Sequence, residues 1–193
     1  VAPQASLGNT GPGFTDAVTL TIGATPGGGT LSGTTTVAAV AGVATFSTLS
    51  IDKSGTGYRL LATAGGLTRT SNAFSIMPGT ATQLGFIGQP GTTTAGSTIS
   101  PAVRVAAQDN FGNTVPSFTG TVTIVIGTNP AGGTLTGTTV VGAAGGVAVF
   151  STLRIDKAGI GYTLVATTGS LTGATSTAFD IVGLGSAAAS SPE

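Results

Sequence analysis

Residues able to act as acids, bases or nucleophiles are scarce in this chain of 193 residues. It has no histidine and no cysteine, and only six acidic and six basic residues. Without histidine or cysteine, the Ser-His and Cys-His pairs of nucleophilic catalysis are excluded. Two of the acids, Asp52 and Asp156, occupy nearly identical surroundings, so we expect them in separate domains rather than as a catalytic carboxylate pair. The sequence therefore predicts no catalytic residue, no cofactor and no enzymatic activity.

One group of polar residues has oxygen ligands of the kind that bind Ca²⁺, namely Asp109 with Asn110 and Asn113. A single carboxylate makes a weak calcium site, and Asx-type hydrogen bonding within a turn explains this spacing better. We therefore predict no metal. Lys53 and Lys157 allow an isopeptide crosslink as an alternative, but both lie beside an Asp in a turn, where a solvated lysine is the simpler interpretation.

The same segment occurs twice in the chain. The residues from Gly27 to Thr63 return as Ala131 to Thr167, and an ungapped match runs from Val1/Val105 to Thr68/Thr172 with about 60% identity. The repeat length of about 100 residues is that of a domain and exceeds that of a solenoid repeat. The sequence therefore predicts two domains in tandem.

Composition limits the partners of these domains. The net charge is zero and no basic cluster occurs, which argues against nucleic acid and anionic membranes as partners. No apolar run approaches about 18 residues, so we expect no membrane insertion. The uncharged surface, rich in Thr and Gly, favours an extracellular or cell-surface location. Pairs such as Thr19/Thr21 and Thr121/Thr123 allow an ice-binding array, but outward-facing strand positions explain them more simply.

Short alternating segments predict an all-β fold of tandem immunoglobulin-like β-sandwiches. In the second copy, strands are expected over 82–88, around Val103 to Ala107, over 121–126, 134–141, 147–155 and 162–166, and over 178–182, with turns between them. We expect an incomplete domain over 1–77, a complete domain over 78–182, and a linker or tail over 183–193. Because Val1 aligns with Val105, the first copy lacks an equivalent of Thr82 to Arg104, including its N-terminal strand. This leaves a hydrophobic slot, either because the chain is a fragment or because another chain fills it.

The segment from Gln108 to Ile124 resembles the strand B to strand C region of bacterial immunoglobulin-like domains, the repeats of invasin- and intimin-type surface proteins. The segments from Ile51 to Tyr58 and from Ile155 to Tyr162 resemble the corner before strand F. The resemblance and the spacing together predict structural corners with a buried tyrosine whose hydroxyl returns to the backbone. The corner residues are Asp52, Gly55, Tyr58, Asp156, Gly159 and Tyr162.

Three functions remain open from these observations. The first is a non-enzymatic structural or adhesive module of a surface protein or fibre that associates with itself or with neighbouring repeats, with a head-to-tail filament held by strand complementation as one form of that association. The second is a glycan- or protein-binding module whose loop tip carries Asn110, Phe111, Asn113 and Phe118, although Phe118 is also expected to pack beneath its loop. The third is an accessory region of a larger secreted enzyme.

Overall fold

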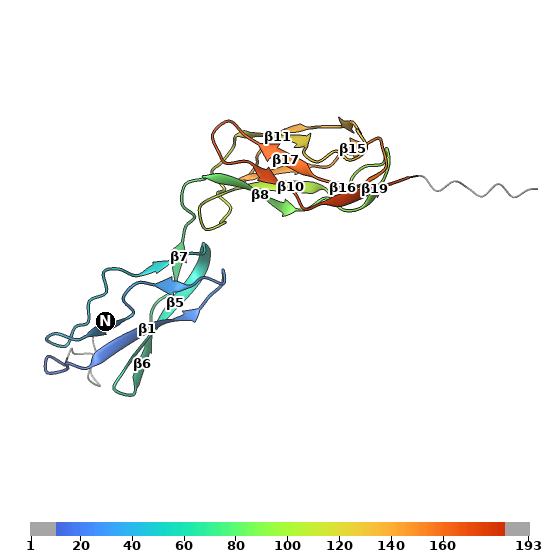
Figure 1. Cartoon of the computed structure of the whole chain (residues 1–193). Helices are drawn as coiled ribbons and strands as arrows, with labels where there is room; N and C mark the ends of the chain where they lie inside the picture. The colour runs from blue at the N-terminus through green and yellow to red at the C-terminus, as the bar shows by residue number, and fades with distance from the viewer. Residues whose placement is uncertain (1–10, 184–193) are drawn as a thin grey trace, which may run out of the picture. The chain divides into compact units, whose positions relative to one another are not determined.

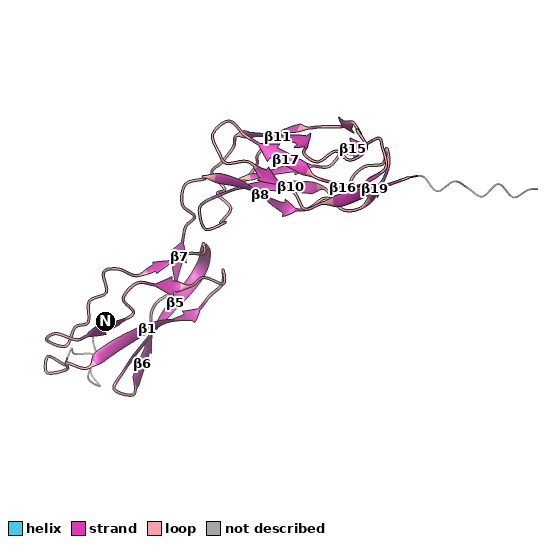
Figure 2. Cartoon of the chain, viewed as in Figure 1, coloured by secondary structure: helices cyan, strands magenta, loops and turns pink. Residues whose placement is uncertain are grey.

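The computed structural model describes residues 11–183, and every regular element within this range is a β-strand (Figures 1 and 2). The prediction of an all-β chain is therefore confirmed. The chain divides into two compact units, Val1–Pro78 (unit 1) and Gly79–Glu193 (unit 2). No helix in the described part is long and apolar enough to cross a bilayer. The predicted linker or tail over 183–193 lies outside the described residues except for Gly183.

Unit 2 is a two-layer sandwich. One sheet has the order β14-β10-β8, and the facing sheet has the order β13-β11-β17-β18. When the strands of these two sheets are counted in chain order, the first, second and fifth lie in one sheet and the third, fourth, sixth and seventh lie in the other, which is an immunoglobulin-like arrangement. The bounds are β8 Gln83–Gly88, β9 Thr93–Thr94, β10 Val103–Gln108, β11 Thr121–Ile126, β12 Leu135–Thr136, β13 Val140–Gly142, β14 Val147–Phe150, β15 Arg154–Ile155, β16 Gly159–Tyr162, β17 Leu164–Thr167, β18 Ala174–Thr175 and β19 Phe179–Val182.

Alternation along the strands builds the core of unit 2. In β11, Val122 and Ile124 are buried while Thr121 and Val125 are exposed, as the period of two in a strand requires. Val103 and Val105 of β10 face them from the other layer and belong to the same buried cluster. Two short strands close the sandwich ends: β9 pairs in parallel with β19, and β12 pairs with β15.

Unit 1 contains one sheet of the order β3-β1-β5-β6, with β7 also paired to β5 and a small β2–β4 pair beside it. Its pairings recur in unit 2: Val18↔Val37 corresponds to Val122↔Val141, and Leu31↔Ile51 corresponds to Leu135↔Ile155. The bounds are β1 Ala17–Ala24, β2 Leu31–Ser32, β3 Thr36–Ala38, β4 Ser50–Ile51, β5 Gly55–Ala64, β6 Leu67–Thr70 and β7 Phe74–Ile76.

The described part of unit 1 has no counterpart of the sheet β14-β10-β8. Residues 43–46, which match β14, make only the local bridge Val40↔Val43 among the pairings between described residues. The match to the end of β10 falls on residues 1–4, outside the described range, and the matches to β8 and β9 would precede Val1. The buried core of unit 1 is accordingly small: Val18, Leu20, Ala39, Ala44 and Ala62.

Candidate functional site: two tyrosine corners, a buried aspartate and an apolar face

Each unit has a buried tyrosine in the strand that follows its corner turn, Tyr58 in β5 and Tyr162 in β16. The Tyr58 hydroxyl donates to the Lys53 carbonyl oxygen at 2.9 Å, and the Tyr162 hydroxyl donates to the Lys157 carbonyl oxygen at 3.0 Å. Both tyrosines are fully buried. Their rings contact Phe74 and Phe179 at centroid distances of 6.1 and 6.2 Å. Each tyrosine therefore ties a turn to the core.

The remaining corner residues also hold the turn. Asp52 Oδ1 accepts from the Thr30 amide at 2.7 Å, and Asp156 Oδ1 accepts from the Thr134 amide at 2.6 Å. Because β2 and β12 begin directly after these threonines, the carboxylates join each corner to the neighbouring strand. A Cβ at Gly159 would lie 3.0 Å from the Tyr162 ring, so glycine allows the ring to pack closely. The six corner residues thus have structural contacts in the two units.

Asp109 is a buried carboxylate surrounded by hydrogen-bond donors. Its Oδ1 accepts from the amides of Phe111 and Asn113, both at 2.9 Å. Its Oδ2 accepts from the Gly79 amide at 2.9 Å and from Asn113 Nδ2 at 3.0 Å. Burial would raise the pKa of this carboxyl, but the hydrogen bonds from the Asn113 side chain and the three amides lower the pKa to about 2.

This arrangement is an Asx-type loop. The N–H groups that point at the carboxylate occupy the directions from which a cation would be bound. Within residues 11–183, no three His, Cys, Asp or Glu side chains gather into a group that could hold a metal ion. Asp109 instead links Gly79, at the start of unit 2, to the loop after β10 through hydrogen bonds.

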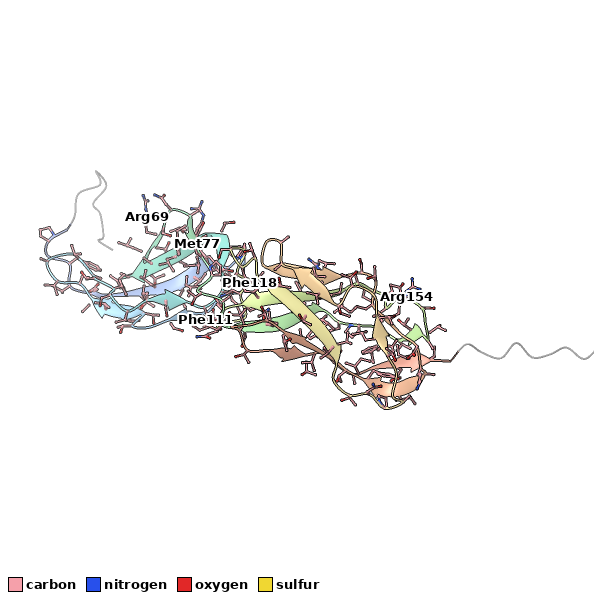
Figure 3. The ribbon with its side chains drawn as sticks, turned by 90° about the horizontal axis from the view of Figure 1, so that it is seen from above. Arg69, Met77, Phe111, Phe118 and Arg154 are labelled. Carbon is pink, nitrogen blue, oxygen red and sulfur yellow. The ribbon has the colours of Figure 1, made fainter. Side chains whose placement is uncertain are left out.

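The four residues predicted as a loop-tip binding site differ in burial; Figure 3 labels two of them, Phe111 and Phe118. Asn113 is buried against Asp109, and Phe118 is half-buried against the core cluster of unit 2. Asn110 is exposed and accepts a hydrogen bond from the Thr82 hydroxyl at 2.8 Å. Phe111 is 60% exposed and is the one aromatic ring of the set with most of its surface open to a ligand.

A hydrophobic face of unit 1 stands out when matched side chains are compared. The Ser71 amide donates to the Leu60 carbonyl oxygen, and the Ser71 hydroxyl oxygen accepts from the Leu60 amide. Ser176 makes the same two hydrogen bonds with Leu164 in unit 2. The sequence match between the units therefore continues past the β5–β6 hairpin, with one extra residue in unit 2. Six apolar side chains in unit 1 are only half-buried, whereas identical side chains in unit 2 are buried. The pairs are Phe46/Phe150, Leu49/Leu153, Ile51/Ile155, Leu60/Leu164, Phe74/Phe179 and Ile76/Ile181.

We call the six unit 1 residues of these pairs the apolar face. Their unit 2 equivalents belong to one buried cluster that also contains Leu84, Ile99 and Val103. Those three residues come from the region 83–104, whose match in unit 1 would precede Val1. The sequence predicted a hydrophobic slot at this position, and the structure identifies the side chains that are less buried there.

Comparisons with known proteins identify no family for this chain. No family model and no curated protein matches it. Similar solved structures include a beta-glycosidase from Bacteroides vulgatus, with 14% identity, a TM-score of 0.46, and coverage of 86% of this chain and 21% of that one. The surface layer protein SbsC, domains 4–9, has 16% identity, a TM-score of 0.38, and coverage of 95% and 25%. The chain thus spans about a fifth of the length of the glycosidase and a quarter of the SbsC chain.

Titin domains z1z2 in complex with telethonin are also similar, with 18% identity, a TM-score of 0.28, and coverage of 88% of this chain and 83% of that one. At these levels of likeness, the function has to be argued from the chain's own residues.

Proposed function

We propose that this chain is a non-enzymatic structural segment of an extracellular or cell-surface protein, built from two copies of one immunoglobulin-like domain. The observation that carries the proposal is the recurrence of the same tyrosine corner, with the same carboxylate bond, in both units. In both units these polar contacts fix turns. In this proposal the first copy lacks its N-terminal strand, and the repeats are of the type found in invasin- and intimin-like surface proteins.

The charged residues support a structural rather than a catalytic role. Asp52, Asp109 and Asp156 each accept hydrogen bonds from backbone amides, which leaves them poorly suited as general acids or bases. A screen of purified chain against hydrolase and transferase substrates should give no turnover. A reproducible turnover abolished by one surface substitution would contradict the structural role.

Adhesion through the loop that carries Phe111 is the second candidate, since this exposed ring is the feature that favours it. Glycan and surface-protein arrays would be probed with the wild-type chain and with Phe111→Ala. Binding by the wild type that the substitution abolishes would support recognition by this loop. A signal that Phe111→Ala leaves unchanged would place recognition elsewhere.

The proposal also includes assembly by strand complementation, in which the apolar face of unit 1 accepts a strand from another segment. This step is supported by six large apolar side chains of unit 1 that are less buried than their identical equivalents in unit 2. Light scattering of the purified chain tests head-to-tail self-assembly. Growth with concentration would identify a second copy as the source of the strand and support a filament, whereas a stable monomer at micromolar concentration would contradict the filament and leave a further repeat segment as the source.

A further inference from the structure

Unit 2 shows in detail how the equivalent of the apolar face is covered. Its β10 pairs with β14, with Val103 opposite Phe150. The Ile99 amide donates to the Leu153 carbonyl oxygen and the Gly96 amide donates to the Ile155 carbonyl oxygen, both at 2.8 Å. A single segment therefore follows β14 and β15 in turn.

The same segment reaches the far end of the sandwich. There β9 pairs in parallel with β19, with Thr93 opposite Ile181, and the Ala95 amide donates to the Val182 carbonyl oxygen at 2.8 Å. The segment Gln83–Arg104 thus contacts the strands that carry Phe150, Leu153, Ile155 and Ile181. The matched residues in unit 1 are the half-buried members of the apolar face.

Because its apolar face has the same residues as the matched positions of unit 2, unit 1 can accept a segment like Gln83–Arg104. All six residues of the apolar face are identical to their unit 2 equivalents. The side chains that fill the corresponding space in unit 2, Leu84, Ile99 and Val103, are buried there. A segment with apolar residues at these three positions would therefore meet in unit 1 the surface that it meets in unit 2.

A second copy of this chain is a poor source of that segment. The chain has two such faces but one segment of this sequence, and unit 2 already holds it in place. A copy that donated Gln83–Arg104 to a neighbour would open its own unit 2, so the exchange would bury no additional apolar surface. A further segment of this type would cover the unit 1 face without opening unit 2.

We propose that the apolar face of unit 1 binds an additional strand segment of the same repeat type, with the sequence pattern and register of Gln83–Arg104 in unit 2. This inference rests on the proposed function, in which the two units are copies of one domain. The occupant is uncharged over most of its length and extended, and it carries apolar side chains equivalent to Leu84, Ile99 and Val103.

An extended variant tests the proposal within one chain. Residues Thr82–Arg104 are duplicated directly before Val1, which recreates the natural junction because Arg104 precedes Val105, the match of Val1. The control carries the same duplication with its Leu84, Ile99 and Val103 copies changed to Ser. Hydrogen exchange of residues 43–51 and 74–77 should slow by about tenfold or more in the extended variant alone, which corresponds to about 1.4 kcal/mol.

A peptide of sequence Thr82–Arg104 tests binding in trans to the full chain. It should bind the wild type and Leu67→Asp, which changes an exposed side chain of β6, but it should not bind Ile76→Asp. Circular dichroism and exchange in β1 and β5 would verify that unit 1 stays folded in both variants. If Ile76→Asp unfolds unit 1, the hydrogen-exchange result for the extended variant is used to judge the proposal.

Absence of added protection in the extended variant would overturn the proposal, as would equal protection by the Ser control. Concentration-dependent protection of the face in the unmodified chain would also overturn it, because a second copy would then be the occupant. The structural role itself is judged by the activity screen, whose result does not depend on strand binding.

Discussion

Substituting Asp109 by Asn should destabilise unit 2 strongly, although the two side chains have nearly the same shape. The carboxylate accepts four hydrogen bonds, two at each oxygen. An asparagine whose carbonyl oxygen replaces Oδ1 places its NH₂ group against the Gly79 amide and Asn113 Nδ2, which are both donors. Two hydrogen bonds to a charged acceptor, at about 1.5–3 kcal/mol each, place the loss of unfolding free energy at about 3–6 kcal/mol.

Asp109 also makes the unfolding free energy of unit 2 depend on pH in the acid range. The pKa of Asp109 is lowered from 3.8 to about 2 in the folded chain, so the unfolded state takes up the proton more readily. The stabilisation is complete above about pH 4 and is lost as the pH falls toward about 2. Asp109→Asn should lack this contribution, and the stability difference between the two proteins should shrink over this pH range.

Denaturant unfolding followed by tyrosine fluorescence measures this effect. The chain has two tyrosines and no tryptophan, so a Tyr58→Phe background leaves Tyr162 as the reporter of unit 2. The control is Asp156→Asn, in which an amide oxygen can still accept from Thr134; exchanging a charged for a neutral acceptor at this exposed site should cost about 1 kcal/mol or less. Equal stability of Asp109→Asn and its parent at pH 7, or a difference that persists unchanged down to pH 2, would refute the reasoning.

Five further substitutions test the corners and the cores, each by calorimetric unfolding. Tyr58→Phe and Tyr162→Phe should each cost about 1 kcal/mol, since one hydroxyl donor is lost while the ring contact stays; no change would argue against the corner bond. Leu164→Ala should cost about 2–5 kcal/mol and Leu60→Ala roughly half as much, because Leu60 is only half-buried; equal costs would contradict the open face. Gly137→Ala should cost more than about 1 kcal/mol, because its φ is 97° and a Cβ would collide with the Thr152 carbonyl.

The long strands and the corners were predictable from local pattern. The alternation of Thr121 to Ile126 identifies β11, because one side of the strand is buried and the other is not. The Asp-x-x-Gly-x-x-Tyr spacing predicts the corner, since its hydrogen bond spans only five residues. Such features depend on neighbours in the sequence, so the sequence contains their signal.

Features that depend on distant partners were less accessible. The turn-rich stretch after Gly88 contains β9, whose two residues are a strand only because β19 lies beside them. Asn113 was expected at a loop tip, where a polar side chain is usually exposed. It is buried because the Asp109 carboxylate needs its donors. Phe118, in contrast, packs on the core cluster of unit 2, in agreement with the expectation that it lies beneath its loop.

The sequence predicted a hydrophobic slot in the first copy, but it did not show which matched side chains are less buried there. Phe46 and Phe150 are identical residues in nearly identical segments, yet Phe150 is 1% exposed and Phe46 is half-buried. The difference arises from β10, which pairs with the strand of Phe150. The repeat therefore predicts where the side chains point, and the covering segment determines how far they are buried.

Residue-resolved hydrogen exchange of the unmodified chain tests most directly whether the two units are copies of one sandwich that differ in their covering layer. Amides of β1 and β5 report on the sheet of unit 1, and residues 43–51 and 147–155 report on the matched layers. We predict slow exchange in β1, β5 and 147–155, and fast exchange in 43–51. Equally slow exchange in 43–51 and 147–155 at low protein concentration would contradict the account.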